Sequence, residues 1–277
     1  MTYASIKATE GRSSYAQEGG HWYTKTGEPM YEVPNASKPG TMRPTTIKDA
    51  RKLGLVPSVS TIMKLEAKPQ LTNWLVQQGM LACLTLPRIH GEDDTQFIKR
   101  ALEDSKQQVI KAAERGQFIH GLLEETMEKN FLPTRASPED AGFVMPVVEW
   151  IHRNFDGYTW HAESSFAFEL NTMRGMRWFA GKRDLTGTHT TNRPVVLDYK
   201  VKDYPANSTK VLAYPEHVTQ LAAYGRPYSK EFTAVNIFVS STAPGVFTPV
   251  NWAQPDISSG WDAFEALVSL WYARNDL

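Results

Sequence analysis

Cysteine is nearly absent from this sequence, which has only Cys83 among its 277 residues. A single cysteine excludes an internal disulfide and an iron–sulfur cluster held by cysteines of this chain. No apolar stretch approaches the ~20 residues needed to cross a membrane. The first residues, MTYASIKATEGRSS, lack the apolar centre of a signal peptide. We therefore expect no membrane association and a cytoplasmic location.

The sequence also lacks net charge, because 30 Lys and Arg residues balance 30 Asp and Glu residues. Non-specific nucleic-acid binding usually leaves an excess of positive charge, so this balance argues mildly against a protein that coats DNA. An enzyme that gathers acids around a metal ion and confines its bases to a groove can still be neutral overall. The net charge therefore does not exclude an enzyme that acts on DNA.

The order of the predicted elements indicates the fold class. Hydrophobic periodicity and capping signals predict helices over 47–52, 58–65, 71–84, 95–130, 137–154, 216–229 and 261–273, and strands over 158–170, 174–184, 194–202, 233–240 and 246–252. Three consecutive strands joined by a helix to a further strand favour a mixed β-sheet flanked by helices. We expect an α/β protein, with an N-terminal arm and mostly helical annex over 1–94 and a core domain over 95–277.

The most informative segments are WFAGKRDLTG and PVVLDYKVK, residues 178–187 and 194–202. They predict a hairpin whose first strand ends in Asp184 and whose second strand carries Asp198 and Lys200. Side chains alternate across a strand, so Asp198 and Lys200 share one face. The opposite face is predicted to be core, and it carries Val195, Leu197, Tyr199 and Val201. Two carboxylates and an amine suit a hard divalent cation and an activated water, which is the chemistry of phosphodiester hydrolysis.

A helical histidine is a second candidate. Gly116, His120 and Glu124 are four residues apart and share a helix face. The glycine leaves room for a metal ion or phosphate, and Glu124 can accept the second imidazole hydrogen. A surface or half-buried histidine without such a role is the alternative.

Two further places hold polar residues that need an explanation. Glu163 lies among aromatic residues on a predicted half-buried strand, where a charge needs a partner. Either a metal cluster or a salt bridge to an arginine would supply that partner. Gln220 and Tyr224 share a face of the next helix with His217, where they could contact a phosphate, steady the amine of Lys200 or simply face water.

Together these segments resemble the PD-(D/E)xK nuclease superfamily, and in particular its RecB-like exonuclease branch. The ordered signature of that branch is a helical histidine, an acid on the first strand, Gly-x-x-Asp, Asp-x-Lys and Gln-x-x-x-Tyr. Here it is matched in order by His120, Glu163, Gly181 to Asp184, Asp198 to Lys200, and Gln220 to Tyr224. The upstream segments VPSVSTIMK and KPQLTNW are similar to the N-terminal part of phage-encoded members and of the mitochondrial genome maintenance exonuclease. Branches with an iron–sulfur cluster need four cysteines, and this chain departs from them.

The resemblance implies a restriction-endonuclease-like core and a role for each residue. His120, Asp184, Asp198 and the main-chain carbonyl of Tyr199 would bind Mg²⁺ or Mn²⁺. The expected catalytic residues are Asp184 and Asp198, together with Lys200, which would orient and help deprotonate the water, and Glu163, which would bind the metal through water or hold a second ion. DNA contacts are expected from Gln220, Tyr224, Arg115, Ser58 and Ser60.

The resemblance also implies a function. We expect a phage-encoded DNA exonuclease that acts in recombination, replication or degradation in the host cytoplasm, where a recombination or replication protein is the kind of partner to expect. An endonuclease of the same fold, structure-specific or of restriction type, is one alternative. A DNA-binding module with an inactive nuclease core is another, although such a copy would be expected to have lost Lys200 or one of the acids.

Overall fold

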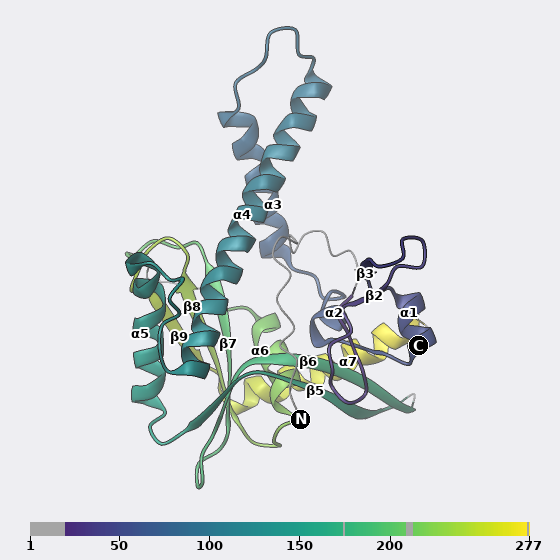
Figure 1. Cartoon of the computed structure of the whole chain (residues 1–277), viewed down its shortest axis with the longest axis vertical. Helices are drawn as coiled ribbons and strands as arrows, with labels where there is room; N and C mark the ends of the chain where they lie inside the picture. Colours follow the sequence, from purple (N-terminus) through teal and green to yellow (C-terminus); the bar gives the residue numbers. More distant parts are fainter. Residues whose placement is uncertain (1–19, 174, 209–212, 276) are drawn as a thin grey trace. The chain divides into compact units, whose positions relative to one another are not determined.

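A five-stranded mixed β-sheet organises this computed structural model, which describes residues 20–173, 175–208, 213–275 and 277 (Figure 1). The strands are β5 (Thr159–Thr172), β6 (Gly175–Thr188), β7 (Val195–Lys202), β8 (Thr233–Ser240) and β9 (Phe247–Asn251), in that order across the sheet. β7 and β8 are parallel, joined through α6 (Pro215–Gly225), and the other neighbouring pairs are antiparallel. The predicted α/β class, with a mixed sheet flanked by helices, is confirmed. The first 19 residues of the predicted N-terminal arm lie outside the described residues.

The chain divides into two compact units. Lys68–Arg115 belongs to the first, and Gly19–Ala67 together with Gly116–Leu277 forms the second. The expected boundary between residues 94 and 95 falls inside the first unit. Helix α4 (Asp94–Lys129) contributes residues to both units.

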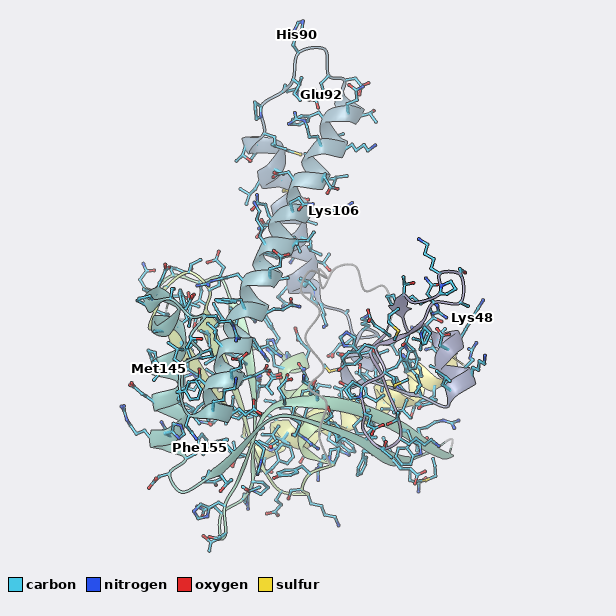
Figure 2. All side chains as sticks on the ribbon, in the orientation of Figure 1. Lys48, His90, Glu92, Lys106, Met145 and Phe155 are labelled. Atoms are coloured by element: carbon cyan, nitrogen blue, oxygen red, sulfur yellow. The ribbon has the colours of Figure 1, made fainter. Side chains whose placement is uncertain are left out.

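The first unit contains α3 (Pro69–Thr85) and the beginning of α4. The predicted helix over 71–84 is confirmed. Figure 2 labels His90 and Glu92 in the connection between these helices. Glu92 forms an ion pair with Arg100 at 2.8 Å, and Arg100 also donates to the carbonyl of Pro87 at 2.7 Å. These contacts tie the connection to the first turns of α4.

The second unit begins with small elements. β1 (Trp22–Tyr23) pairs with β4 (Val56–Pro57), and β2 (Glu32–Pro34) pairs with β3 (Met42–Pro44). Helices α1 (Ile47–Leu53) and α2 (Val59–Met63) follow the signals in the sequence. The side chains of Thr46 and Asp49 form a capping box at the start of α1, and Gly54 ends the helix with a left-handed φ of 65°. The helix predicted over 47–52 is therefore confirmed.

Helices cover both faces of the large sheet (Figure 1). On one face, α5 (Pro138–Asn154) and the second-unit part of α4 pack against Val195, Leu197 and Tyr199 of β7. On the other face, α6, α7 (Gln254–Asn275) and α2 pack around Val196 and residues of the neighbouring strands. The predicted alternation of β7 is confirmed, because its odd-numbered residues enter the first of these clusters.

Helix α7 begins seven residues before the predicted start at Trp261. The reason is local, because Pro255 stands in its first turn, where a missing backbone N–H costs no helical hydrogen bond. The side-chain amide of Gln254 also donates to the backbone carbonyl of Phe232 at 2.8 Å, which anchors this end of the helix.

Strand β6 continues to Thr188, so the prediction that it ends at Asp184 is wrong. The extra residues are held on both sides, since β5 pairs with Leu185–Thr188 and β7 pairs with Leu185–Gly187. The ladder between β6 and β7 has only three residue pairs, the last of which is Leu185 with Leu197. Beyond that pair the two strands diverge, and this opening positions the candidate site.

Candidate metal centre

Asp184 and Asp198 face each other where β6 and β7 separate. They would form the next pair of the ladder after Leu185 and Leu197, yet no backbone pairing joins them. Instead, the backbone N–H of Tyr199 donates to Oδ2 of Asp184 at 2.9 Å. A strand residue directs its N–H and C=O to the same edge, so the Tyr199 carbonyl also faces this opening. The two predicted acids and the predicted main-chain ligand are thus brought to one place.

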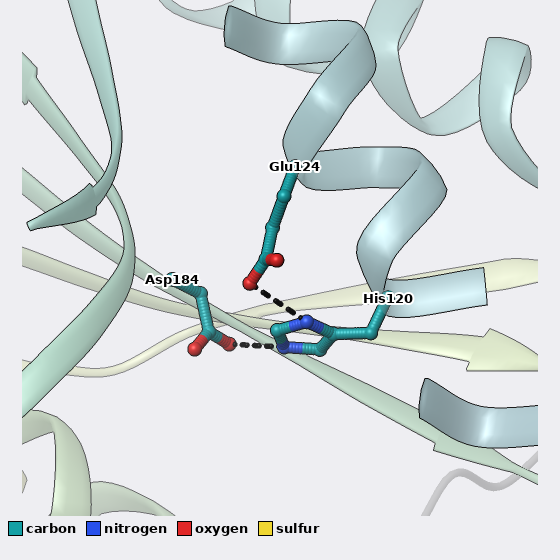
Figure 3. A group of neighbouring side chains, drawn as sticks. All are labelled: His120, Glu124 and Asp184. Carbon is teal, nitrogen blue, oxygen red and sulfur yellow. Dashed lines mark hydrogen bonds and ion pairs between the residues drawn. The ribbon is translucent and has the colours of Figure 1, made fainter. Parts of the chain in front are cut away.

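His120 approaches Asp184 from helix α4 (Figure 3). Its Nε2 lies 2.8 Å from Oδ2 of Asp184, and its Nδ1 lies 2.8 Å from Oε1 of Glu124. One ligand atom from each of the three residues falls within 4.8 Å of the others, a spacing at which such groups can hold a metal ion. The imidazole turns different nitrogens to the two carboxylates, so an ion at Nε2 would be shared with Asp184 and not with Glu124. The aromatic ring of Tyr199 meets the imidazole edge-on, with centroids 5.6 Å apart. Two carboxylates and a ring therefore fix the orientation of the imidazole.

The charges of this group depend on one another. Burial disfavours a charged imidazole, but Asp184 and Glu124 outweigh burial and hold the pKa of His120 well above its usual value. Burial likewise disfavours the charge on Asp184, yet His120 and Lys200 lower the pKa of that carboxyl. An ion that binds through Nε2 must replace the proton there, so cation binding and proton release are linked at this histidine.

Asp198 is paired with Lys200 on the same strand face. The amine lies 2.8 Å from Oδ1 and 2.6 Å from Oδ2 of Asp198. Asp198 itself is only 1% exposed to solvent. Burial, together with the nearby charge of Asp184, raises the pKa of Asp198 to about 6 against the opposing effect of Lys200. The environments of the two acids thus drive their pKa values apart.

Helix α6 supplies the next partners of the amine. Lys200 donates to Oε1 of Gln220 at 3.0 Å, and Nε2 of Gln220 donates to the Tyr224 hydroxyl at 3.0 Å. Of the roles predicted for Gln220 and Tyr224, the structure shows Gln220 in contact with the Lys200 amine and Tyr224 in contact with Gln220. Tyr224 is 7% exposed, which leaves little of its side chain for a direct contact with DNA.

Glu163 lies beside the site on β5, in an unusual conformation. Register places it opposite Asp184, but the ladder skips this pair, and its φ is 56°. A left-handed conformation at a residue other than glycine costs on the order of 1–3 kcal/mol and often marks a functional site. The side chain is 43% exposed, so the expected burial of Glu163 is not observed. Its partner is Lys182, by an ion pair, rather than an arginine.

The remaining predicted DNA contacts lie elsewhere. Ser58 is buried, where its hydroxyl caps α2 by accepting the N–H of Thr61 at 3.0 Å. Ser60 is exposed, and its hydroxyl lies 2.9 Å from that of Ser58. Arg115 belongs to the first unit. The hydroxyls of Ser58 and Ser60 contact each other, and that of Ser58 also contacts Thr61, and the contacts of all three predicted residues with DNA stay predictions.

Two residues that contact the site were missed by the sequence analysis. Asn236 on β8 donates from Nδ2 to Oδ2 of Asp198 at 2.7 Å, and Nε1 of Trp252 donates to Oδ1 of Asn236 at 2.8 Å. The available signal was the asparagine in TAVNIFVS, a strand that is otherwise largely apolar. A polar side chain in a buried strand needs a hydrogen-bond partner, and Asp198 supplies one.

The donor set fits a hard divalent cation. Oδ1 of Asp184 accepts no hydrogen bond from any residue in the described ranges, while Oδ2 holds two. Carboxylate and carbonyl oxygens suit Mg²⁺, and an added imidazole suits Mn²⁺. Asp184, Asp198, the Tyr199 carbonyl and His120 are therefore chemically able to hold either ion.

Comparisons with known proteins add little to this geometry. No family model matches the sequence, and no curated protein matches it. A solved structure described as "Crystal structure of SSO0001" has a TM-score of 0.34 and 12% identity, covering 72% of this chain and 84% of that one. Among the described residues, no helix combines the length and apolarity needed to span a bilayer.

Proposed function

We propose that this protein is a divalent-metal-dependent DNA exonuclease of the RecB-like, PD-(D/E)xK kind, with a restriction-endonuclease-like core. The observation that carries the proposal is the convergence at the separation of β6 and β7. There the strands bring together Asp184, Asp198 and Lys200. His120, which precedes Asp184 by 64 residues, reaches the same place from a helix. The motif order in the sequence and the contacts in the fold point to the same residues.

The metal site of this enzyme would consist of Asp184, Asp198, the carbonyl of Tyr199 and His120. When bound, Mg²⁺ or Mn²⁺ supplies a Lewis acid for the scissile phosphate and lowers the pKa of a coordinated water. Glu124 holds the far side of the His120 ring and so keeps Nε2 directed at the site. Glu163 on β5 and Lys182 on β6 form an ion pair beside the metal site, and from there Glu163 could reach the ion through a water.

Lys200 would act on the attacking water. Its amine is held by Gln220 and by Asp198, which places a donor next to the metal ligands. We assign it the orientation of the attacking water and help in removing its proton. The attacking water gives up a proton to solvent with the help of this amine, and its oxygen forms the new bond to phosphorus. The bond to the departing sugar oxygen breaks, and that oxygen takes up a proton from solvent. Tyr224 steadies Gln220 and thereby the amine.

Hydrolysis of matched DNA substrates tests this function. Linear and covalently closed circular DNA of one sequence, each single- and double-stranded, are incubated with pure protein in Mg²⁺, in Mn²⁺ and in excess chelator. We expect loss of the linear forms only, and only with metal. Asp198→Ala should abolish hydrolysis, whereas Asp156→Ala, at an exposed carboxylate after α5, should leave it unchanged.

Each other outcome has a definite meaning. Full activity in chelator would refute a metal mechanism. Rapid cutting of closed circles would favour an endonuclease of the same fold. Binding of DNA without hydrolysis in either metal would favour an inactive DNA-binding module. A phage origin, the host cytoplasm and a recombination or replication partner remain predictions from the resemblance.

A further inference from the structure

Asn236 is the most deeply buried polar contact of the candidate site. It is 0% exposed and lies directly beside Asp198 in the parallel register of β7 and β8. Its amide nitrogen is 2.7 Å from Oδ2 of Asp198. A buried amide must satisfy both its nitrogen and its oxygen, so the partner of the oxygen decides which way it points.

Trp252 decides the orientation of that amide. The indole Nε1–H can only donate, and it lies 2.8 Å from Oδ1 of Asn236. The backbone N–H of Trp252 donates to the carbonyl of Ala234 at 3.0 Å, which holds the tryptophan beside β8. A flipped amide would set two N–H groups against each other. The amide nitrogen of Asn236 is therefore directed at Asp198.

The two oxygens of Asp198 are consequently different. Oδ2 receives Asn236 at 2.7 Å and Lys200 at 2.6 Å, whereas Oδ1 contacts only Lys200, at 2.8 Å, among the residues that the structure describes. Asp184 shows the same asymmetry, because its Oδ2 accepts both His120 and the N–H of Tyr199. Each acid has one oxygen held by the protein and a second that is less occupied.

We propose that Asn236, oriented by Trp252, is a positioning residue that holds Oδ2 of Asp198 and presents Oδ1 alone to the divalent cation. The inference rests on the proposed function. Monodentate carboxylates suit the small octahedral shell of Mg²⁺ and Mn²⁺, whereas Ca²⁺ readily takes bidentate carboxylates. The pair Asn236–Trp252 thus favours the smaller ions over Ca²⁺.

Binding of Mn²⁺ alone, measured by titration calorimetry and by electron paramagnetic resonance, tests this role without any DNA. Trp252→Phe keeps the ring and removes the N–H, and Asn236→Ala removes the amide. Loss of such outer contacts typically weakens metal binding about 10- to 100-fold. We expect a loss in that range for Asn236→Ala and a smaller loss for Trp252→Phe. Both variants should also reduce the preference for Mg²⁺ over Ca²⁺, measured by how well each of these ions displaces bound Mn²⁺.

Trp160→Phe is the matched control, since the indole N–H of Trp160 is buried and has no acceptor within the described part of the chain. Its Mn²⁺ affinity should equal that of the unmodified protein. Unchanged affinity and unchanged ion preference in folded Trp252→Phe would overturn the inference and leave the proposed function standing. Absence of Mn²⁺ binding by the unmodified protein would overturn both. If Asn236→Ala fails to fold by circular dichroism, Trp252→Phe alone decides.

Discussion

Two aromatic rings pack closely against Gly181 on β6, so a single added methyl group tests the packing behind the candidate site. A Cβ at this position would lie 2.9 Å from Cε1 of Tyr224 and 3.0 Å from Cε1 of Phe166. Both rings are buried and pack edge-on against each other, with centroids 6.2 Å apart. Neither ring can move away without disturbing the other. Gly181→Ala should therefore strain the strand and shift Tyr224.

The magnitude follows from two opposing effects. Placing one methylene too many into a tight core costs about 1–3 kcal/mol. Alanine in a strand is better than glycine by roughly 0.5–1 kcal/mol, because glycine loses more backbone freedom on folding. The midpoints of these two ranges give an expected net destabilisation of roughly 1 kcal/mol. A shift of Tyr224 also releases Gln220 from its hydroxyl, so turnover should fall together with stability.

Urea unfolding measures the stability, with Gly116→Ala as the control. Within the described part of the chain, a Cβ at Gly116 would meet only Cβ of Val201, at an ordinary 3.8 Å. That helical position should gain about 0.5–1 kcal/mol with alanine. Gly225→Ala should lie at the other extreme, since its Cβ would overlap the buried ring of Phe232. A Gly181→Ala variant as stable as the unmodified protein would refute this packing argument. So would any order of stability other than Gly116→Ala first, Gly181→Ala second and Gly225→Ala last.

Three more predictions concern the charges. Lys200→Ala should lower turnover by ~100-fold or more with only a modest loss of DNA affinity, and a collapse of affinity with normal turnover at saturation would make Lys200 a phosphate anchor instead. His120→Ala should impair cleavage of linear DNA in Mg²⁺, and raised Mn²⁺ should partly restore it; no rescue would remove His120 from the metal ligands. Asp49→Asn should destabilise the fold at neutral pH, because hydrogen bonds from Arg43 and Thr46 hold the pKa of Asp49 well below its usual value. That stability is present above the unfolded-state pKa near about 4 and is lost as pH falls through the lower folded-state value, so unfolding free energies of the two proteins should converge in acid. A difference that does not shrink between pH 7 and about pH 3 would contradict this assignment.

Much of the local structure could be predicted from short-range signals. The ends of α1, at Thr46 and Gly54, and the start of α5, at Ser137, could be predicted because helix caps depend on residues within one turn. The alternation around Asp198 assigned the faces of β7 for the same reason, since a strand repeats every two residues. The order of the motifs placed His120, Asp184, Asp198 and Lys200 in one hypothesis before their contacts were known.

Only the tertiary structure decided how those residues meet. The sequence has no local signal for the point at which β6 and β7 separate, because that point depends on how β6 pairs with β5 and β7. The same pairing extends β6 to Thr188. The ion pair of Glu163 depends on register across β5 and β6, and the contact of Asn236 with Asp198 depends on pairing of strands 38 residues apart. Trp252 enters from beyond β9 for the same reason. Caps and periodicity are properties of neighbouring residues, whereas the candidate site results from pairing and packing between distant ones.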